Sequence, residues 1–364
     1  MKKRKMNRKL NFNAGPGALP AEVLQQAAAA VVEYNNSGLS ILEISHRGTA
    51  FANIIEESKQ LVRELCELDE DYEILWMHGG GRMQFCMIPM NFLGKDDFAG
   101  YIDSDHWSHS AMEYAKFYGN VQVLASSADD RYNHLPSWPE FIPAHLSYLH
   151  YTSNNTIYGS QWQTVPKCNV PLIADMSSDI FCSKRDYKNC DMFYAAVQKN
   201  VGAAGVTLVV IRKDMLQRIK RSLPSMLDYK AQANENSILN TAPVFAIYTA
   251  LLTLRWTKAQ GIDSLEKENR QKAHILYEEV ERNSLFNLYV QNKEDRSLMN
   301  VCFTAIDPAT EKGFLKFCEE RNISGVKGHR SLGGFRVSLY NAVTMQATEQ
   351  LVTAMKEYEH SVSI

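Results

Sequence analysis

Two neighbouring stretches decide the fold: Val170-Pro-Leu-Ile-Ala-Asp175, and Gln198-Lys-Asn-Val-Gly-Ala-Ala-Gly205 further along the chain. A short apolar run closed by one polar residue is typical of a buried strand, which holds Asp175 rigidly at the strand end. Lys199 follows 24 positions later, on the turn after the next strand-like run. The two stretches therefore predict an acid and an amine that lie together at one edge of a sheet.

An acid and an amine in this arrangement are what a pyridoxal phosphate site needs. The acid keeps the pyridine nitrogen protonated, and the lysine forms a Schiff base with the C4′ aldehyde. We therefore predict that Lys199 and Asp175 are the catalytic residues. The expected cofactor is pyridoxal 5′-phosphate, carried covalently on Lys199.

Composition limits the class of protein. With 364 residues, the chain exceeds what one core usually serves, and 45% hydrophobic and 22% charged residues are ordinary for a globular protein. The formal net charge of −2 provides no overall attraction to nucleic acid, so no such partner is expected. The nearly apolar stretch 201–211 is shorter than the roughly 20 residues that a membrane span needs.

Cysteine usage and the N-terminus indicate a cytoplasmic protein. The seven cysteines are an odd number without a Cys-x-x-Cys pair, which argues against a disulfide framework and a zinc site, and no metal is expected. No hydrophobic region follows the basic residues of the first ten positions, which excludes a signal peptide. We expect residues 1–10 to be a disordered leader, with an RNA-binding arm as the alternative.

Short β-rich runs alternate with helical patterns such as 82–93 and 108–117, which implies βα units and a mainly parallel sheet. We predict an α/β fold whose large, cofactor-binding domain contains a mainly parallel seven-stranded sheet. After Gly261 a long polar helix and a few strand-like segments predict a smaller α/β C-terminal domain, which divides the chain into residues 11–260 and 261–364. The seven expected strands are Ile74–Met77, Tyr101–Asp103, Val121–Leu124, Leu146–Tyr151, Leu172–Asp175, Met192–Ala196 and Val206–Ile211.

A glycine run and several single residues are further candidates for cofactor binding. Gly79 to Arg82 follow a strand and open a helix, where backbone N–H groups can approach a phosphate; a plain turn is the alternative. Trp107 could stack on the pyridine ring or be an ordinary buried anchor. Thr156 could donate a hydrogen bond to the ring's phenolate oxygen, or it could cap a turn. Asn240 and Thr241 could bind a phosphate across a subunit boundary, or they could cap a helix.

Basic residues gather in two further places, His46 with Arg47 and His329 with Arg330. Arg336 lies on the polar face of an alternating strand pattern. As a planar fork, Arg336 could bind a substrate carboxylate with two hydrogen bonds, or it could simply be solvated. The clusters together predict a substrate with an anion at both ends.

At this point the sequence resembles phosphoserine aminotransferases, which are fold type I pyridoxal phosphate enzymes of the class V aminotransferase group. The resemblance runs from Asn11–Pro16, through Glu43–Gly48, to Tyr340–Ala342. Its most specific motifs are Gly79–Arg82 and Gln198–Asn200, and Lys327–Arg330 is similar to the family's substrate-phosphate segment.

The resemblance implies a role for each matching position and a homodimer with shared active sites. Lys199 would form the internal aldimine, Asp175 would pair with the pyridinium, Trp107 would stack and Thr156 would contact the phenolate oxygen. Arg336 would bind the α-carboxylate. The cofactor phosphate would be held by Gly81, Arg82 and Gln198 with Asn240 and Thr241 of the neighbouring subunit, and the distal anion by His46, Arg47, His329 and Arg330.

The implied reaction is a ping-pong transamination in serine biosynthesis. L-Glutamate and 3-phosphohydroxypyruvate would give 2-oxoglutarate and O-phospho-L-serine. A phosphorylated hydroxythreonine of pyridoxine synthesis, a second substrate of some family members, stays open. The alternatives are an alanine–glyoxylate type aminotransferase, a cysteine desulfurase, or a catalytically silent scaffold on the same fold.

Overall fold

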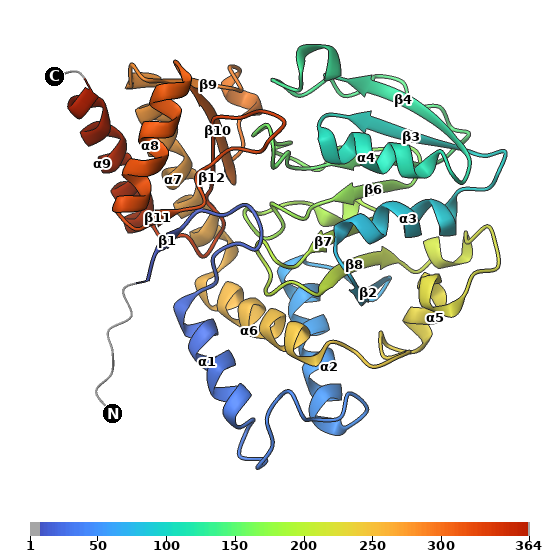
Figure 1. The fold of residues 1–364 in the computed structure, drawn as a ribbon. Coiled ribbons are helices and arrows are strands. Elements are labelled where there is room, and N and C mark those ends of the chain that lie inside the picture. The colour runs from blue at the N-terminus through green and yellow to red at the C-terminus, as the bar shows by residue number, and fades with distance from the viewer. Residues whose placement is uncertain (1–7, 363–364) are drawn as a thin grey trace.

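A seven-stranded sheet forms the centre of the larger part of the molecule in the computed structural model, which describes residues 8–362 (Figure 1). The strand order is β2-β8-β7-β6-β5-β3-β4, and β8 alone runs antiparallel to its neighbours. The predicted mainly parallel sheet is therefore confirmed. Its strands are β2 (Tyr72–His78), β3 (Phe98–Asp103), β4 (Asn120–Ser126), β5 (Leu146–Thr152), β6 (Leu172–Asp175), β7 (Met192–Ala196) and β8 (Val206–Arg212).

Both faces of this sheet are covered by helices, because its strands carry apolar side chains on both sides. In β2, Trp76 belongs to the hydrophobic cluster on one face and Met77 to the cluster on the other. In β8, Leu208 and Val209 divide in the same way. One face packs against α1 (Ala21–Val32), α2 (Thr49–Leu65) and α6 (Val244–Gln260), and the other against α3 (Gly81–Phe92), α4 (His106–Ala115) and α5 (Tyr229–Asn234).

The C-terminal part has its own core around a small antiparallel sheet of order β12-β10-β9. The N-terminal strand β1 pairs in parallel with β11, and Phe12 lies in this second core, so residues 10–12 pack with the C-terminal part. Its elements are α7 (Ile262–Arg282), β9 (Phe286–Leu288), β10 (Asn300–Ala305), α8 (Pro308–Glu320), β11 (Ile323–Ser324), β12 (Phe335–Ser338), α9 (Met345–Val362) and β1 (Leu10–Asn11).

The expected leader lies mostly outside the described residues, because residues 1–7 are not described and Leu10 already belongs to β1. The predicted domain boundary near Gly261 stays a prediction; Gly261 stands between α6 and α7 with a φ of 78°. Within residues 8–362, no helix combines the length and apolar character needed to cross a membrane.

A buried ion pair supports the loop after β6. The Arg185 Nη2 atom lies 2.8 Å from Asp179 Oδ2, and these side chains are only 1% and 0% exposed. Asp179 also accepts a hydrogen bond from Gln161 at 3.1 Å. Removing one member of a buried pair leaves the other charge without compensation in a low dielectric.

We expect Arg185→Gln to lower the free energy of unfolding by about 3–5 kcal/mol, because Asp179 would remain buried and unpaired. Arg321→Gln is the control, since the Arg321–Glu357 pair is solvent-exposed and such pairs contribute about 0–1 kcal/mol. Urea unfolding of the two variants measures the difference. Equal unfolding free energies would contradict the role given to the buried pair.

Candidate active site

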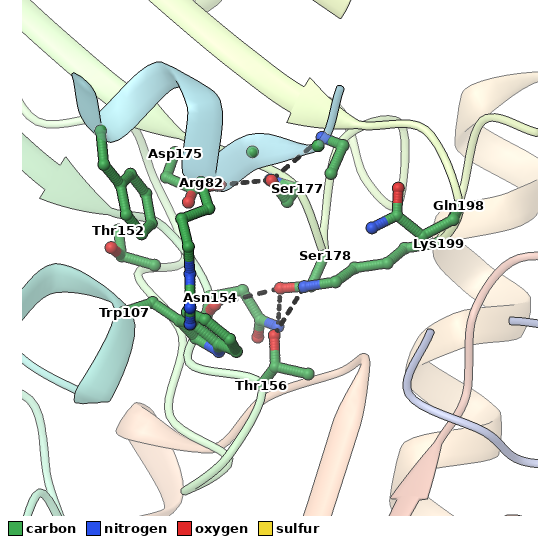
Figure 2. Close-up of a pocket in the computed structure, with 14 residues that line it drawn as sticks. Arg82, Trp107, Thr152, Asn154, Thr156, Asp175, Ser177, Ser178, Gln198 and Lys199 are labelled. Carbon is green, nitrogen blue, oxygen red and sulfur yellow. Dashed lines mark hydrogen bonds between the residues drawn. The ribbon is translucent and has the colours of Figure 1, made fainter. Parts of the chain in front are cut away.

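A cavity of about 230 Å³ lies at the edge of the sheet where the parallel strands end (Figure 2). Ligand sites of open α/β sheets form at the carboxyl ends of strands, where the strand order switches. Here the switch falls between β3 and β5, since the chain passes from β4 back to β5 on the other side of β3. The cavity is lined by Gly80, Gly81, Arg82, Phe85, Trp107, Thr152, Asn154, Thr156, Asp175, Ser177, Ser178, Ala196, Gln198 and Lys199.

The first turn of α3 forms one end of the cavity and suits an anion. Gly80 is the N-cap residue, no side chain caps the helix, and the first turn carries no acid. Its free N–H groups and the helix dipole therefore favour a phosphate. A Cβ atom at Gly81 would lie 3.3 Å from Ser177 Oγ, so glycine keeps this approach open. Gln198 extends into the same cavity (Figure 2).

The Lys199 amine reaches into the cavity and donates a hydrogen bond to Thr156 Oγ1 at 3.0 Å (Figure 2). Burial lowers the pKa of Lys199, the attraction of Asp175 opposes that change, and the repulsion of Arg336 adds to it. A lowered pKa increases the neutral fraction of the amine, which is the form that attacks a carbonyl carbon.

Asp175 ends β6 and is 6% exposed. Its Oδ1 atom accepts a hydrogen bond from the Ser177 backbone N–H at 2.9 Å. Burial raises the pKa of Asp175, while Lys199 and the Ser177 hydrogen bond oppose the change. The carboxylate form is thus costly when isolated, and a cation placed against it would be bound strongly.

Trp107 forms a side wall of the cavity and is placed by the start of α4. The Asp105 carboxylate caps this helix by accepting hydrogen bonds from the N–H groups of Trp107 at 2.8 Å and Ser108 at 2.7 Å. Arg82 lies over the indole ring, with its Cζ atom 5.4 Å from the ring centroid.

Arginines and histidines gather at the mouth of the cavity. Arg336 in β12 donates to the Thr156 carbonyl at 3.3 Å, and its register opposite Cys302 confirms the predicted strand. Burial lowers the pKa of His329, and Arg336 and Arg330 lower it further. Among the described residues no carboxylate forms an ion pair with Arg82, Arg330 or Arg336. These three arginines therefore present positive charge at the mouth that no ion pair within the described residues neutralises.

Seven predicted site residues do not line this cavity; three of them, His329, Arg330 and Arg336, gather at its mouth, and four lie elsewhere. His46 and Arg47 lie on the connection between α1 and α2, and Asn240 and Thr241 on the connection between α5 and α6. Both connections lie below the sheet in Figure 1, beside the lower helices. The chain alone thus brings together seven of the nine expected cofactor-binding residues: Gly81, Arg82, Trp107, Thr156, Asp175, Gln198 and Lys199.

Sequence reasoning missed the small polar residues that follow the strand ends. Asn154 and Ser178 hold each other, since Asn154 Nδ2 donates to Ser178 Oγ at 2.7 Å and Ser178 Oγ donates to the Asn154 carbonyl at 3.0 Å. Thr152 and Ser177 line the cavity beside them. The only sequence feature that could have identified these residues is their position, because each lies within a few residues of the end of β5 or β6.

Fold, site and sequence define an aminotransferase of class V. The family model described as aminotransferase class-V matches residues 9–351. A phosphoserine aminotransferase of Flavobacterium psychrophilum is 43% identical over 357 residues, with 98% of this chain and all of that protein covered. The phosphoserine aminotransferase of Bacillus subtilis is 41% identical, with coverage of 97% and 99%.

Solved structures agree with this class. The phosphoserine aminotransferase from Bacillus circulans superposes with a TM-score of 0.94 at 39% identity and covers 97% of this chain and 99% of its own. The PLP-bound phosphoserine aminotransferase from Trichomonas vaginalis gives a TM-score of 0.91 at 35% identity, with coverage of 96% and 100%. The chain belongs to the phosphoserine aminotransferase family.

The cap of α4 predicts a pH dependence of stability. Burial raises the pKa of Asp105 to about 7, against the opposing hydrogen bonds from Ser108 and Trp107. The folded protein keeps a proton on Asp105 that the unfolded chain releases near pH 4, so this residue destabilises the fold increasingly as pH rises from about 4 to 7.

Asp105→Asn keeps a capping oxygen and removes the titration. We expect its free energy of unfolding, measured without cofactor and relative to wild type, to increase by on the order of 2 kcal/mol between about pH 5 and pH 8. Urea unfolding at the two pH values gives the comparison. A difference that is the same at both pH values would contradict the raised pKa of Asp105.

Proposed function

We propose that this chain transfers the amino group of L-glutamate to 3-phosphohydroxypyruvate, with pyridoxal phosphate as cofactor, in serine biosynthesis. The products are 2-oxoglutarate and O-phospho-L-serine. The observation that carries the proposal is the Lys199 amine in one cavity with the Asp175 carboxylate, beneath a mouth of arginines that no carboxylate neutralises. Its relatives of 41–44% identity are phosphoserine aminotransferases.

The cavity fits the cofactor at each of its functional groups. The glycine turn before α3 suits the phosphate, the indole of Trp107 provides a flat wall for the ring, and Asp175 offers a buried carboxylate to the ring nitrogen. Thr156 lies beside the Lys199 amine, where it can donate to the phenolate oxygen. When bound, pyridoxal phosphate supplies an aldehyde carbon that bonds to amines and a ring that withdraws electrons from the substrate's α-carbon.

The chain's own residues then bind substrate and move the proton. Lys199, as a neutral amine, can remove the α-proton of glutamate in the first half-reaction and deliver a proton to the α-carbon of the second substrate in the other. Burial and Arg336 both favour the neutral amine, because they lower the pKa of Lys199. Arg336 can bind the α-carboxylate of either substrate. Asp175 favours the protonated ring by electrostatic attraction.

Both substrates use the same site in turn, which predicts ping-pong kinetics. Glutamate and phosphohydroxypyruvate each carry a carboxylate near the reacting carbon and a second anion at the other end. Arginine and histidine donate equally well to a carboxylate or a phosphate. The alternative of an alanine–glyoxylate aminotransferase is not favoured, since the Nostoc enzyme of that name is only 18% identical and shares the fold alone.

We also propose a cytoplasmic homodimer with shared sites. His46, Arg47, Asn240 and Thr241 lie outside the cavity of their own chain, which is the expected result if they complete the partner's cavity. Three apolar side chains on or beside the connection that carries His46 are exposed, Val32 at 83%, Leu39 at 48% and Leu42 at 61%, as those of a covered interface would be in a single chain. The free state of all seven cysteines supports a reducing compartment.

The first test is Lys199→Ala with glutamate and phosphohydroxypyruvate. We expect turnover to fall at least about 1,000-fold, because the base and the covalent anchor are both lost. Wild-type protein should absorb in the visible range with cofactor, and borohydride should bleach the band and attach the cofactor to the peptide containing Lys199. A wild-type protein that stays colourless with added cofactor would support the silent scaffold, and attachment to another lysine would contradict the assignment of Lys199.

The second test is subunit mixing. Lys199→Ala and Arg47→Ala homodimers should each be nearly inactive with phosphohydroxypyruvate, while hybrids formed by refolding the two together should recover up to about a quarter of wild-type activity, because each hybrid has one intact site. Mixing Lys199→Ala with Asp175→Ala is the control and should recover nothing, since both residues belong to one chain's cavity. No recovery in the first mixture would contradict shared sites.

A further inference from the structure

His106, the first residue of α4, lies beside His329 at the cationic mouth of the cavity. Its ring centroid lies 5.1 Å from that of Trp107 and 6.2 Å from that of His329. These contacts join a residue next to the ring-stacking tryptophan with the loop before β12. The side chain is exposed, so a substrate can reach it.

The charged groups that shift the pKa of His106 are all basic. Its pKa is lowered first by burial and then by Arg82, His109 and Arg330. Arg82 comes from α3 and Arg330 from the loop before β12, whereas His109 lies one turn further along α4 against Asp103 and Glu113. His106 in turn lowers the pKa of His329. An anion bound between the two histidines would oppose these shifts and favour their protonated forms.

The spacing of the two histidines suits one tetrahedral anion. A charge-assisted hydrogen bond to a phosphate oxygen spans about 2.7–2.9 Å. The oxygens of a phosphate point in different directions from the phosphorus atom, so two donors can bind different oxygens of the same group. Rings whose centroids are 6.2 Å apart and tilted by 36° can therefore donate to the same phosphate from two sides. A carboxylate, which is planar and carries one charge, makes weaker use of this arrangement.

We propose that His106 is a specificity-determining residue that binds the phosphate of the phosphorylated substrate together with His329. Its role rests on the proposed function and extends it, because the distal-anion site then includes a residue of the same helix that positions Trp107. The phosphate would be held between α4 and the loop before β12. The α-carboxylate would remain with Arg336, and the reacting carbon would lie between the two anchors.

The test compares His106→Gln with His109→Gln in the cofactor-loaded enzyme. His109 lies one turn further along α4 but faces acids, with its Nδ1 atom 3.5 Å from Asp103 Oδ2 and its Nε2 atom 4.0 Å from Glu113 Oε1. We expect His106→Gln to raise the KM for phosphohydroxypyruvate about 10-fold with little change in kcat, which is the loss of one charge-assisted hydrogen bond. His109→Gln should leave KM unchanged.

Three further measurements separate recognition from a structural effect. The kcat/KM for hydroxypyruvate, which lacks the phosphate, should be unchanged in His106→Gln, and the KM for glutamate should rise less than that for phosphohydroxypyruvate. His106→Lys, which restores a cation, should recover part of the loss. An equal loss with hydroxypyruvate and phosphohydroxypyruvate, or no loss with either, would overturn the role of His106.

A binding measurement keeps this inference distinct from the proposed function. The titration uses cofactor-loaded protein, so that the cofactor's own phosphate site is filled and inorganic phosphate reports on the substrate site. Inorganic phosphate should bind about 10-fold more weakly to His106→Gln than to wild type or His109→Gln, because one hydrogen bond is lost. Failure of wild type to use phosphohydroxypyruvate would remove the proposed function while this comparison still decides the role of His106. Equal affinity in all three proteins would refute it.

Discussion

The attraction between the Lys199 amine and the Asp175 carboxylate in a buried cavity is the interaction on which the site depends. Burial acts against both charges, lowering the pKa of one group and raising that of the other, while their mutual attraction works in the opposite sense. Burial thus disfavours the ionised form of each group, and an opposite charge nearby favours it. A cationic ring placed against Asp175 would provide one and release the lysine to act as a base.

This pair is held from both parts of the molecule. Asn200, beside the lysine, accepts a hydrogen bond from the Asn341 backbone N–H at 3.0 Å, and the Tyr340 hydroxyl donates to the Ala14 carbonyl at 2.7 Å. The Gly17 N–H donates to the Gln198 carbonyl at 2.8 Å. The lysine segment is therefore enclosed by the N-terminal segment and the C-terminal part, and its position depends on the packing of both. Loosening either contact would move the amine relative to Asp175.

The cations at the mouth complement the pair below. Arg336 reaches the site from β12 and approaches the Thr156 carbonyl, while His329 and Arg330 come from the loop before that strand. Positive charge without acidic partners is costly in the free protein and is offset when a doubly anionic substrate binds. Substrate selection therefore has an electrostatic origin, and a keto acid without a second anion would leave part of this positive charge without a partner.

The sequence by itself determined the strands, the acid at the end of β6 and the amine 24 positions later, because strand periodicity and the chemistry of a strand end are local properties. It also placed Arg336 on the polar face of β12. Only the tertiary structure showed that His106 faces His329, that Asn154 and Ser178 hold each other, and that β1 pairs with β11. These contacts join segments that are distant along the chain, and they depend on crossovers and packing, which leave no periodic pattern in the residues themselves.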